Sequence, residues 1–116
     1  MRRAAVIDIG SNSVRLVVYG VEGASLVSLF DEKAMCGLGR GLSETGKLHP
    51  DGRVSAIAEL RRFAQVAADE EPDAIFPFAT SAVRDASDAT DFVDAVKAAT
   101  GFDIEIISGL EEARLA

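Results

Sequence analysis

The chain has 116 residues, of which 48% are apolar and 27% are charged, and its formal net charge is −7 at pH 7. This length leaves room for one hydrophobic core but not for two independent domains. The acidic balance argues against non-specific binding to nucleic acid or to anionic lipid.

The sequence also indicates the cellular compartment of the protein. No apolar run approaches the roughly 20 residues that a bilayer span needs, and Asp8 interrupts the N-terminal apolar stretch too early for the core of a signal peptide. The single Cys36 cannot form an internal disulfide, and one histidine with one cysteine is too few for a His/Cys zinc site. We therefore expect a cytoplasmic protein with no membrane partner.

The first third of the chain is typical of β-structure. Residues 4–9 form a short apolar run that ends at Gly10, which predicts a buried strand. Residues 14–21 are rich in β-branched side chains, and the turn at residues 22–23 leads into a further strand at residues 25–30. Together these segments predict a three-stranded antiparallel meander.

A glycine-rich loop at residues 37–41 precedes the first long helix. His49 and Pro50 open this helix, because proline suits the first helical position, and Pro72 ends it. Apolar residues at three- and four-residue spacing predict the buried stripe: Val54, Ile57, Leu60, Ala64 and Ala67. Residues 74–79 then predict a second buried strand.

The last third predicts a helix, a strand and the start of another helix. A helix begins at Asp88 or Thr90 and ends at Gly101, with an inward face. Its inward residues are Phe92, Val93 and Val96. A third buried strand follows, formed by Ile104, Ile106 and Ile107. Ser108 and Glu111 then have the spacing of a capping box.

The expected order is therefore β-β-β-α-β-α-β-α, an α/β fold in which a mixed sheet carries helices on its faces. In such sheets, ligands gather beyond the carboxyl ends of the parallel strands. Three polar segments are predicted at those ends: residues 8–13, residues 80–84 and residues 108–112. This convergence favours a functional site there.

Asp8 stands between Ile7 and Ile9 in an otherwise apolar strand. Burying a carboxylate costs several kcal/mol unless it is paired or faces a cation. It could face a magnesium ion directly or through the water shell, since magnesium prefers oxygen ligands. Alternatively, backbone N–H groups of the next loop could bind it.

Gly10, Ser11, Asn12 and Ser13 follow directly. Successive small residues let backbone N–H groups converge on an anion, and two hydroxyl groups can add donors. Taken alone, the segment is better explained by a plain hairpin turn. Its position directly after Asp8 favours phosphate binding.

Thr80 and Arg84 share a face if the segment after the second buried strand is helical. The guanidinium could then bind phosphate with two parallel hydrogen bonds. The alternative is an exposed ion pair of Arg84 with Asp85 or Asp88, which contributes about 0–1 kcal/mol.

Two adjacent acids begin the last predicted helix. Glu111 has the capping position, so its simplest role is structural. Glu112 points about 100° further around the helix. It is therefore the better candidate to orient and deprotonate a water molecule, and the helix N-terminus stabilises its ionised form.

Three other features carry less chemistry. The glycine-rich loop at residues 37–41 is not a dinucleotide-binding fingerprint, because no strand-to-helix junction is predicted around it; it could instead be a mobile flap near the pocket. His49 is predicted to be structural at a helix start. Cys36 is predicted to face the core rather than to act as a nucleophile.

Three motifs resemble those of the exopolyphosphatase and guanosine pentaphosphate phosphohydrolase (Ppx/GppA) family: VIDIGSNS at residues 6–13, TSAVR at residues 80–84 and IISGLEEAR at residues 106–114. They occur in the family's order and span nearly the whole chain. The resemblance implies the first lobe of an actin-like, sugar-kinase-like fold.

The resemblance also implies roles and partners. Asp8 would hold magnesium-bound phosphates, Ser11 and its loop would cradle the terminal phosphoryl group, Arg84 would stabilise its charge, and Glu112 would be the general base. The substrate would be polyphosphate or guanosine pentaphosphate, the cofactor Mg²⁺, and the full-length protein a homodimer that does not act on nucleic acid.

The chain departs from the family pattern in two places. Relatives often carry a basic residue where this chain has Cys36 and Gly37. The family's second glycine-rich phosphate loop, expected soon after residue 114, does not occur before Ala116. Residues 1–116 are therefore expected to be one lobe that supplies half of an active site. Two alternatives to a hydrolase are a kinase of the same fold and a non-catalytic fragment that binds polyphosphate or an alarmone.

Overall fold

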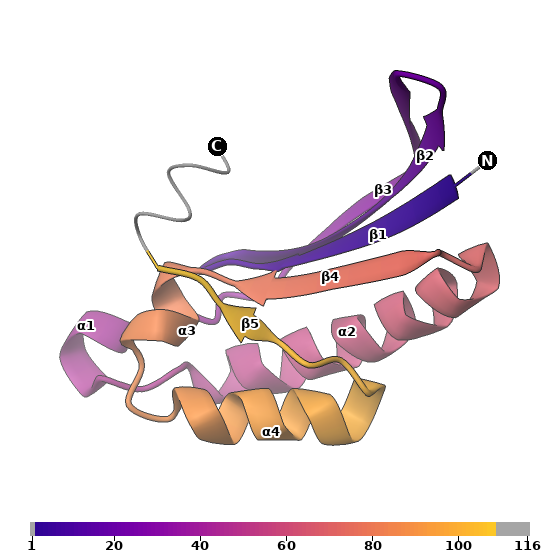
Figure 1. Cartoon of the computed structure of the whole chain (residues 1–116). Coiled ribbons are helices and arrows are strands. Elements are labelled where there is room, and N and C mark those ends of the chain that lie inside the picture. The colour runs from indigo at the N-terminus through magenta and orange to yellow at the C-terminus, as the bar shows by residue number, and fades with distance from the viewer. Residues whose placement is uncertain (1, 109–116) are drawn as a thin grey trace.

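The computed structural model describes residues 2–108, which form a five-stranded sheet with the strand order β3-β2-β1-β4-β5 (Figure 1). The strands are β1 Arg2–Ile9, β2 Ser13–Glu22, β3 Ser25–Met35, β4 Ala74–Ala79 and β5 Glu105–Ile106. The helices are α1 Leu42–Thr45, α2 Pro50–Glu70, α3 Ser81–Asp85 and α4 Ala89–Thr100. The predicted mixed sheet is confirmed, since β1 is antiparallel to β2 and parallel to β4.

The predicted meander is also confirmed, but β3 is longer than expected. It continues to Met35 instead of ending at Phe30, and it pairs with β2 as far as Ser13. Residues 31–33 are all charged, which argues against a strand in the sequence. An edge strand tolerates such side chains because they can reach solvent, and backbone pairing with β2 extends it.

The predicted apolar stripe of α2 is confirmed except at Val54: Leu60 and Ala67 are buried, and Ile57 and Ala64 pack against the core. Val54 is 71% exposed. The buried residues of α2 are Gly52, Ala56, Leu60, Phe63 and Ala67. The prediction for Val54 is wrong because this residue lies about 200° around the helix from Ala56, at 100° per residue. In the first turn of α2, the residue that faces the core is therefore Gly52 and not Val54.

The helix and strand near the end of the described chain follow the prediction in part. In α4, Phe92 and Val96 are buried, Val93 packs against the core, and Gly101 ends the helix in the left-handed conformation. The predicted third strand is reduced to two residues, and Ile106 is 38% exposed rather than buried. It is an edge strand bonded to β4 alone, so only part of it is covered.

The core lies between the sheet and the helices α2 and α4, which cover the same face of the sheet (Figure 1). Ile7, Ile9 and Leu16 belong to this core and are fully buried. Phe76 in β4 remains 56% exposed. Within residues 2–108, no helix is both long and apolar enough to cross a membrane.

Candidate functional site

The polar segments after β1 and β4 converge at one edge of the sheet, where these two strands end side by side. The backbone N–H of Thr80 donates to the carbonyl of Ile9 at 3.1 Å, and that of Ile107 donates to Ala79 at 3.0 Å. The Nη1 of Arg84 donates to the carbonyl of Ile107 at 3.2 Å. The ends of β1, β4 and β5 are thus linked to one another. The predicted convergence is confirmed for residues 8–13 and 80–84, and residues 109–112 of the third predicted segment lie outside the described residues.

The turn between β1 and β2 is closed by a hydrogen bond from the Gly10 N–H to the Ser13 carbonyl, 2.9 Å long. The N–H of Gly10 is therefore committed to the turn and is not a phosphate donor in this conformation. The carbonyls of Ser11 and Asn12 accept hydrogen bonds from the loop at residues 36–39. Because N–H and C=O of a trans peptide point in opposite directions, the N–H groups of Asn12 and Ser13 point away from that loop.

The glycine-rich loop packs directly against this turn. The N–H of Gly39 donates to Ser11 at 2.8 Å, and the N–H of Gly37 donates to Asn12 at 3.0 Å. A Cβ atom on Gly39 would lie 3.2 Å from the Cβ of Ser11 and 3.5 Å from the Cβ of Ala82 in α3. The loop therefore fills the space between the turn and α3, and a side chain at position 39 would crowd the turn.

The expectation that no strand-to-helix junction surrounds this loop is wrong. The loop does connect a strand to a helix, since β3 ends at Met35 and α1 begins at Leu42. However, α1 has only four residues, and the loop is bonded to the turn after β1. Its place beside the candidate site agrees with the position expected of a flap.

Asp8 alternates along β1 with Ile7 and Ile9, so its side chain lies on the opposite face of the sheet. Its partners in the sheet register are Arg15 on β2 and Phe78 on β4. Its Oδ1 atom is buried. The Asp8 carboxylate thus sits beside a cation at the second-to-last residue of β1, partly shielded from solvent.

Arg15 is engaged mainly by another acid. Its Nε donates to Asp31 Oδ1 at 2.8 Å and its Nη2 to Asp31 Oδ2 at 2.5 Å. This pairing raises the pKa of Arg15, with a smaller contribution in the same direction from Asp8, and it lowers the pKa of Asp31. The fork of Arg15 is therefore occupied by Asp31.

The carboxylate of Asp8 is a suitable ligand for magnesium, but the described residues do not provide a complete set of protein ligands around it. Among residues 2–108, no three His, Cys, Asp or Glu side chains cluster as a metal site. Magnesium commonly binds one or two carboxylates and keeps several waters. Asp8 can therefore serve as a single ligand, directly or through water.

Arg84 and Thr80 are related as predicted. Thr80 is buried and precedes α3, and the N–H of Arg84 donates to the Thr80 carbonyl at 3.1 Å, as residues four apart in a helix do. Arg84 also forms an ion pair with Asp85 at 3.5 Å, one of the two alternatives. The other, Asp88, binds Arg53 instead.

The two smaller predictions about His49 and Cys36 agree with the structure. The Nδ1 of His49 accepts a hydrogen bond from the Gly52 N–H at 3.3 Å, which caps the start of α2. Cys36 is buried, and burial raises the pKa of its thiol. Since the thiolate is the nucleophile, Cys36 is suited to packing rather than to catalysis.

Glu111 and Glu112 lie outside the described residues, which end at Ser108. Their assignments as cap and general base therefore stay predictions.

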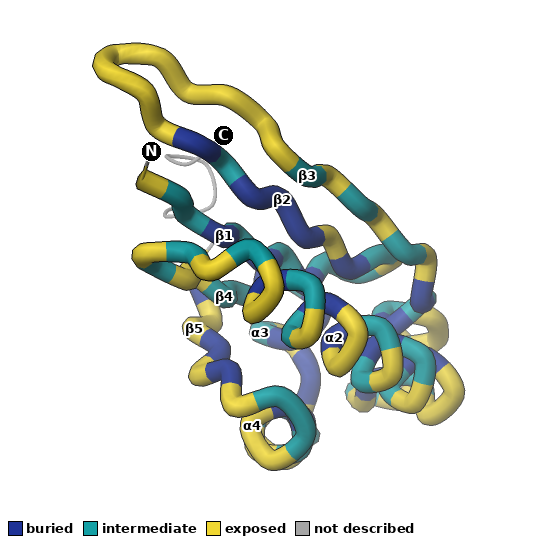
Figure 2. The backbone as a smooth tube through the Cα atoms, turned by 90° about the vertical axis from the view of Figure 1, so that its right-hand side faces the viewer, coloured by how far each residue is buried: buried dark blue, intermediate teal, exposed yellow. Residues whose placement is uncertain are grey.

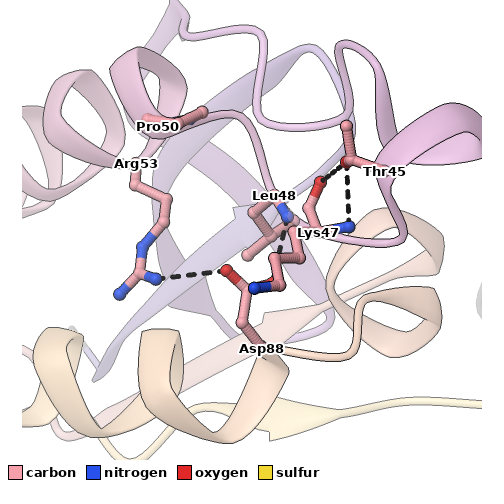
Figure 3. A pocket seen from close by; sticks show the side chains of 6 residues that line it. All are labelled: Thr45, Lys47, Leu48, Pro50, Arg53 and Asp88. Carbon is pink, nitrogen blue, oxygen red and sulfur yellow. Dashed lines mark hydrogen bonds and ion pairs between the residues drawn. The ribbon is translucent and has the colours of Figure 1, made fainter.

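A link between the two loops that precede α2 and α4 is visible only in the structure. The Oδ1 of Asp88 accepts the N–H of Leu48 at 3.0 Å, and its Oδ2 accepts Arg53 Nη1 at 3.2 Å (Figure 3). Ser87 donates to the carbonyl of Gly46 at 2.8 Å. A pocket of about 270 Å³ lies here, lined by Thr45, Lys47, Leu48, Pro50, Arg53 and Asp88. The sequence identifies Asp88 as a helix start and as a possible partner of Arg84, but no pattern predicts its contact with Leu48, 40 residues away.

Comparison with known proteins assigns the family. The model of the Ppx/GppA phosphatase family matches residues 3–116. The chain belongs to this family. Exopolyphosphatase 1 of Mycobacterium tuberculosis (strain H37Rv) is 32% identical over 114 residues, which cover 97% of this chain and 33% of that protein.

Solved structures of Ppx/GppA proteins have the same fold. The Aquifex aeolicus family member superposes with a TM-score of 0.95 at 31% identity, over 99% of this chain and 38% of that one. An exopolyphosphatase from Cytophaga hutchinsonii gives a TM-score of 0.93 at 29% identity, over 98% and 36%. The predicted actin-like lobe is confirmed, and this chain spans about a third of the length of the curated relatives it matches.

Proposed function

We propose that this chain is the phosphate-binding lobe of a magnesium-dependent hydrolase that releases the terminal phosphate of inorganic polyphosphate or guanosine pentaphosphate. The observation that carries the proposal is that the end of β1, which leads directly into the Gly10–Ser13 turn, is hydrogen-bonded to the Thr80–Arg84 segment at the carboxyl end of the sheet, and that this segment is bonded in turn to Ile107 after β5. Membership of a phosphatase family supports the reaction class.

Two segments bind the terminal phosphoryl group in this proposal. Ser11, Asn12 and Ser13 hold the terminal phosphoryl group, with Gly10 closing the turn that presents them. Thr80 and Arg84 hold the same group from α3, where the positive guanidinium offsets the charge that spreads over the phosphoryl oxygens. In phosphoryl transfer, this positioning and charge stabilisation supply most of the catalysis.

Glu112 is the general base in this proposal. A water oxygen forms a bond to the terminal phosphorus, its proton passes to the Glu112 carboxylate, and the phosphoanhydride P–O bond breaks so that the shortened chain leaves with the bridging oxygen. Asp8 would hold magnesium, which supplies positive charge to the phosphate oxygens when bound. A readout independent of turnover is the binding of Mn²⁺, followed by electron paramagnetic resonance, which Asp8→Asn should weaken.

This lobe supplies one wall of the site, so residues 1–116 alone should release little phosphate. In-line transfer depends on geometry, and a displacement of about 1 Å costs around 100-fold in rate. The full-length protein that carries this chain is proposed to be a cytoplasmic homodimer. Its preference between the two substrates is measured by kcat/KM for each.

The test compares Glu112→Gln with Glu111→Gln in that full-length protein. Glu112→Gln should lower turnover by about 10²–10⁴-fold, which is the usual contribution of a general base. Glu111→Gln should instead cost about 1 kcal/mol or less of stability through the cap. Phosphate release and thermal unfolding measure the two effects. A larger loss of turnover in Glu111→Gln would refute the assignment of the base.

Two other outcomes would replace the proposal. Formation of ADP from ATP, coupled to phosphorylation of a metabolite, would indicate a kinase of the same fold. Binding of polyphosphate without any turnover by the full-length protein would indicate a sensor.

A further inference from the structure

Arg40 lies in the loop that packs against the phosphate-binding turn. The preceding residue, Gly39, donates its N–H to Ser11 at 2.8 Å. The backbone N–H of Arg40 donates to the Gly37 carbonyl at 3.3 Å, and its Nε is 3.5 Å from the same oxygen. Gly37 in turn donates to Asn12. The loop therefore holds the Arg40 backbone one residue away from a direct contact with the turn.

The side chain of Arg40 folds back over Gly37. A Cβ atom on Gly37 would lie only 2.6 Å from the Nε of Arg40 and 3.3 Å from its Cζ. Gly37 has a φ of 70°, a conformation that favours glycine. A larger residue at position 37 would displace the guanidinium, so the loop geometry and the glycine together keep Arg40 near the turn.

Arg40 differs from most arginines of the described chain in its partners. Five of them have a carboxylate oxygen within 4.0 Å: Arg3, Arg15, Arg53, Arg62 and Arg84. For Arg40, the residues between 2 and 108 supply no such oxygen, and the side chain is exposed. The chain has a net charge of −7, yet no acid among the described residues neutralises the Arg40 guanidinium beside the site.

We propose that Arg40 is a substrate-binding residue that grips a phosphate group of the substrate next to the terminal one. The inference rests on the proposed function, which assigns the terminal group to the turn and to Arg84. A planar guanidinium suits this role, because it binds phosphate oxygens with two parallel hydrogen bonds. The ligand class is a chain of condensed phosphates, which presents a second anionic group just beyond the first.

The experiment uses the full-length protein with three variants. Arg40→Gln removes the charge and keeps a long polar side chain, Arg40→Lys keeps the charge without the fork, and Arg61→Gln is the matched control. Arg61 is also an exposed arginine with no carboxylate within 4.0 Å among the described residues, but it lies well along α2, on the solvent side. Thermal unfolding of each variant confirms that it folds.

Arg40→Gln should raise KM for polyphosphate about tenfold and change kcat by no more than about twofold, as expected for a lost charge-assisted contact of about 1.4 kcal/mol. Arg40→Lys should lie between wild type and Arg40→Gln. The rise of KM with KCl concentration should be shallower in Arg40→Gln, since one fewer charged contact is screened. Arg61→Gln should match wild type in both readouts.

An unchanged KM in Arg40→Gln, or an equal rise in Arg61→Gln, would overturn the inference while leaving hydrolysis intact. Absence of phosphate release by wild type would instead refute the proposed function. Calorimetric titration with tripolyphosphate then tests Arg40 separately: about tenfold weaker binding by Arg40→Gln supports it, and equal binding or none by wild type overturns it.

Discussion

The two ends of the sheet are built in different ways. At the end where β1 and β4 finish, backbone hydrogen bonds join the turn to the glycine-rich loop and join the end of β1 to Thr80, which precedes α3. At the other end, the β2–β3 hairpin extends past the helices and is exposed along its tip (Figure 2). Leu26 is 64% exposed there, and a Cβ on Gly23 would meet no atom within 4 Å.

The difference shows where this fold requires precise packing. Near the site, the backbone of Gly37 lies so close to Gly52 that position 52 has no room for a side chain. Position 39 has little more room, because Ser11 lies next to it. At the hairpin tip, Gly23 serves only the φ of the turn, which is 60°. The candidate site therefore sits at the tightly packed end of the sheet, as the positioning of phosphate oxygens would require, whereas the other end has room for larger side chains.

The largest expected effect is the loss of activity on substitution of Arg84, which lies at the site end of the sheet. In the full-length protein, Arg84→Ala should lower kcat/KM for polyphosphate by about 10²–10³-fold, the usual cost of removing one donor that stabilises developing charge. Arg84→Lys should restore little, because an ammonium group cannot reproduce the planar fork. Steady-state phosphate release measures both variants.

The Arg84 variants separate three roles. Full recovery with lysine would leave Arg84 only a point-charge role. Near-normal activity of Arg84→Ala would assign the side chain to its ion pair with Asp85, which is exposed and contributes about 0–1 kcal/mol.

A second, smaller effect tests the packing difference by itself. An alanine Cβ at position 52 would lie 2.7 Å from the carbonyl oxygen of Gly37 and 2.9 Å from its carbonyl carbon. Because both contacts are backbone atoms, the loop or α2 must move. Gly52→Ala should therefore lower the free energy of unfolding by about 1–3 kcal/mol, even though alanine favours a helix by about 1 kcal/mol over glycine.

Gly23→Asn is the matched control, since asparagine tolerates a positive φ and a Cβ there meets no neighbouring atom. Its free energy of unfolding should stay within about 0.5 kcal/mol of wild type. Urea unfolding followed by circular dichroism compares the two variants. Equal free energies of unfolding for Gly52→Ala and Gly23→Asn would mean that the site end accommodates an added side chain as readily as the hairpin tip does.

Most of the fold is predictable from the sequence because its signals are local. Proline at position 50, glycine at position 101 and the apolar run at residues 74–79 each mark an element within a few residues. The errors arise where a tertiary contact decides. Val54 fits the helical spacing, but the buried stripe begins at Gly52, where α2 meets the loop. Ile106 has the character of a core residue, but it lies on an edge strand.

The candidate site is predictable as a set of segments but not as a set of contacts. Parallel strands bring their carboxyl ends together, which is enough to predict residues 8–13 beside residues 80–84. The contact of Gly39 with Ser11 and the link from Asp88 to Leu48 depend on how loops fold over one another. Such pairings have no period or motif, so only the structure reveals them.

The smallest effect is expected from an ion pair of the β2–β3 hairpin, between Arg15 and Asp31. Both side chains are nearly half exposed. The hydrogen bonds from Arg15 lower the pKa of Asp31 below its ordinary value. A lowered pKa in the folded state gives stability that is present above the unfolded pKa, about 3.9, and is lost as pH falls through the folded value.

Carboxyl chemical shifts measured by NMR should therefore show Asp31 titrating below about pH 3.9, and its midpoint should return toward that value in Arg15→Gln. Wild type should be slightly more stable than Asp31→Asn above about pH 4, and the difference should close at lower pH, because the carboxyl is then protonated in both states. Salt should reduce the difference, since an exposed pair is screened. A difference that widens on acidification would contradict this sign. A large, salt-independent difference would contradict the weak contribution expected of an exposed pair.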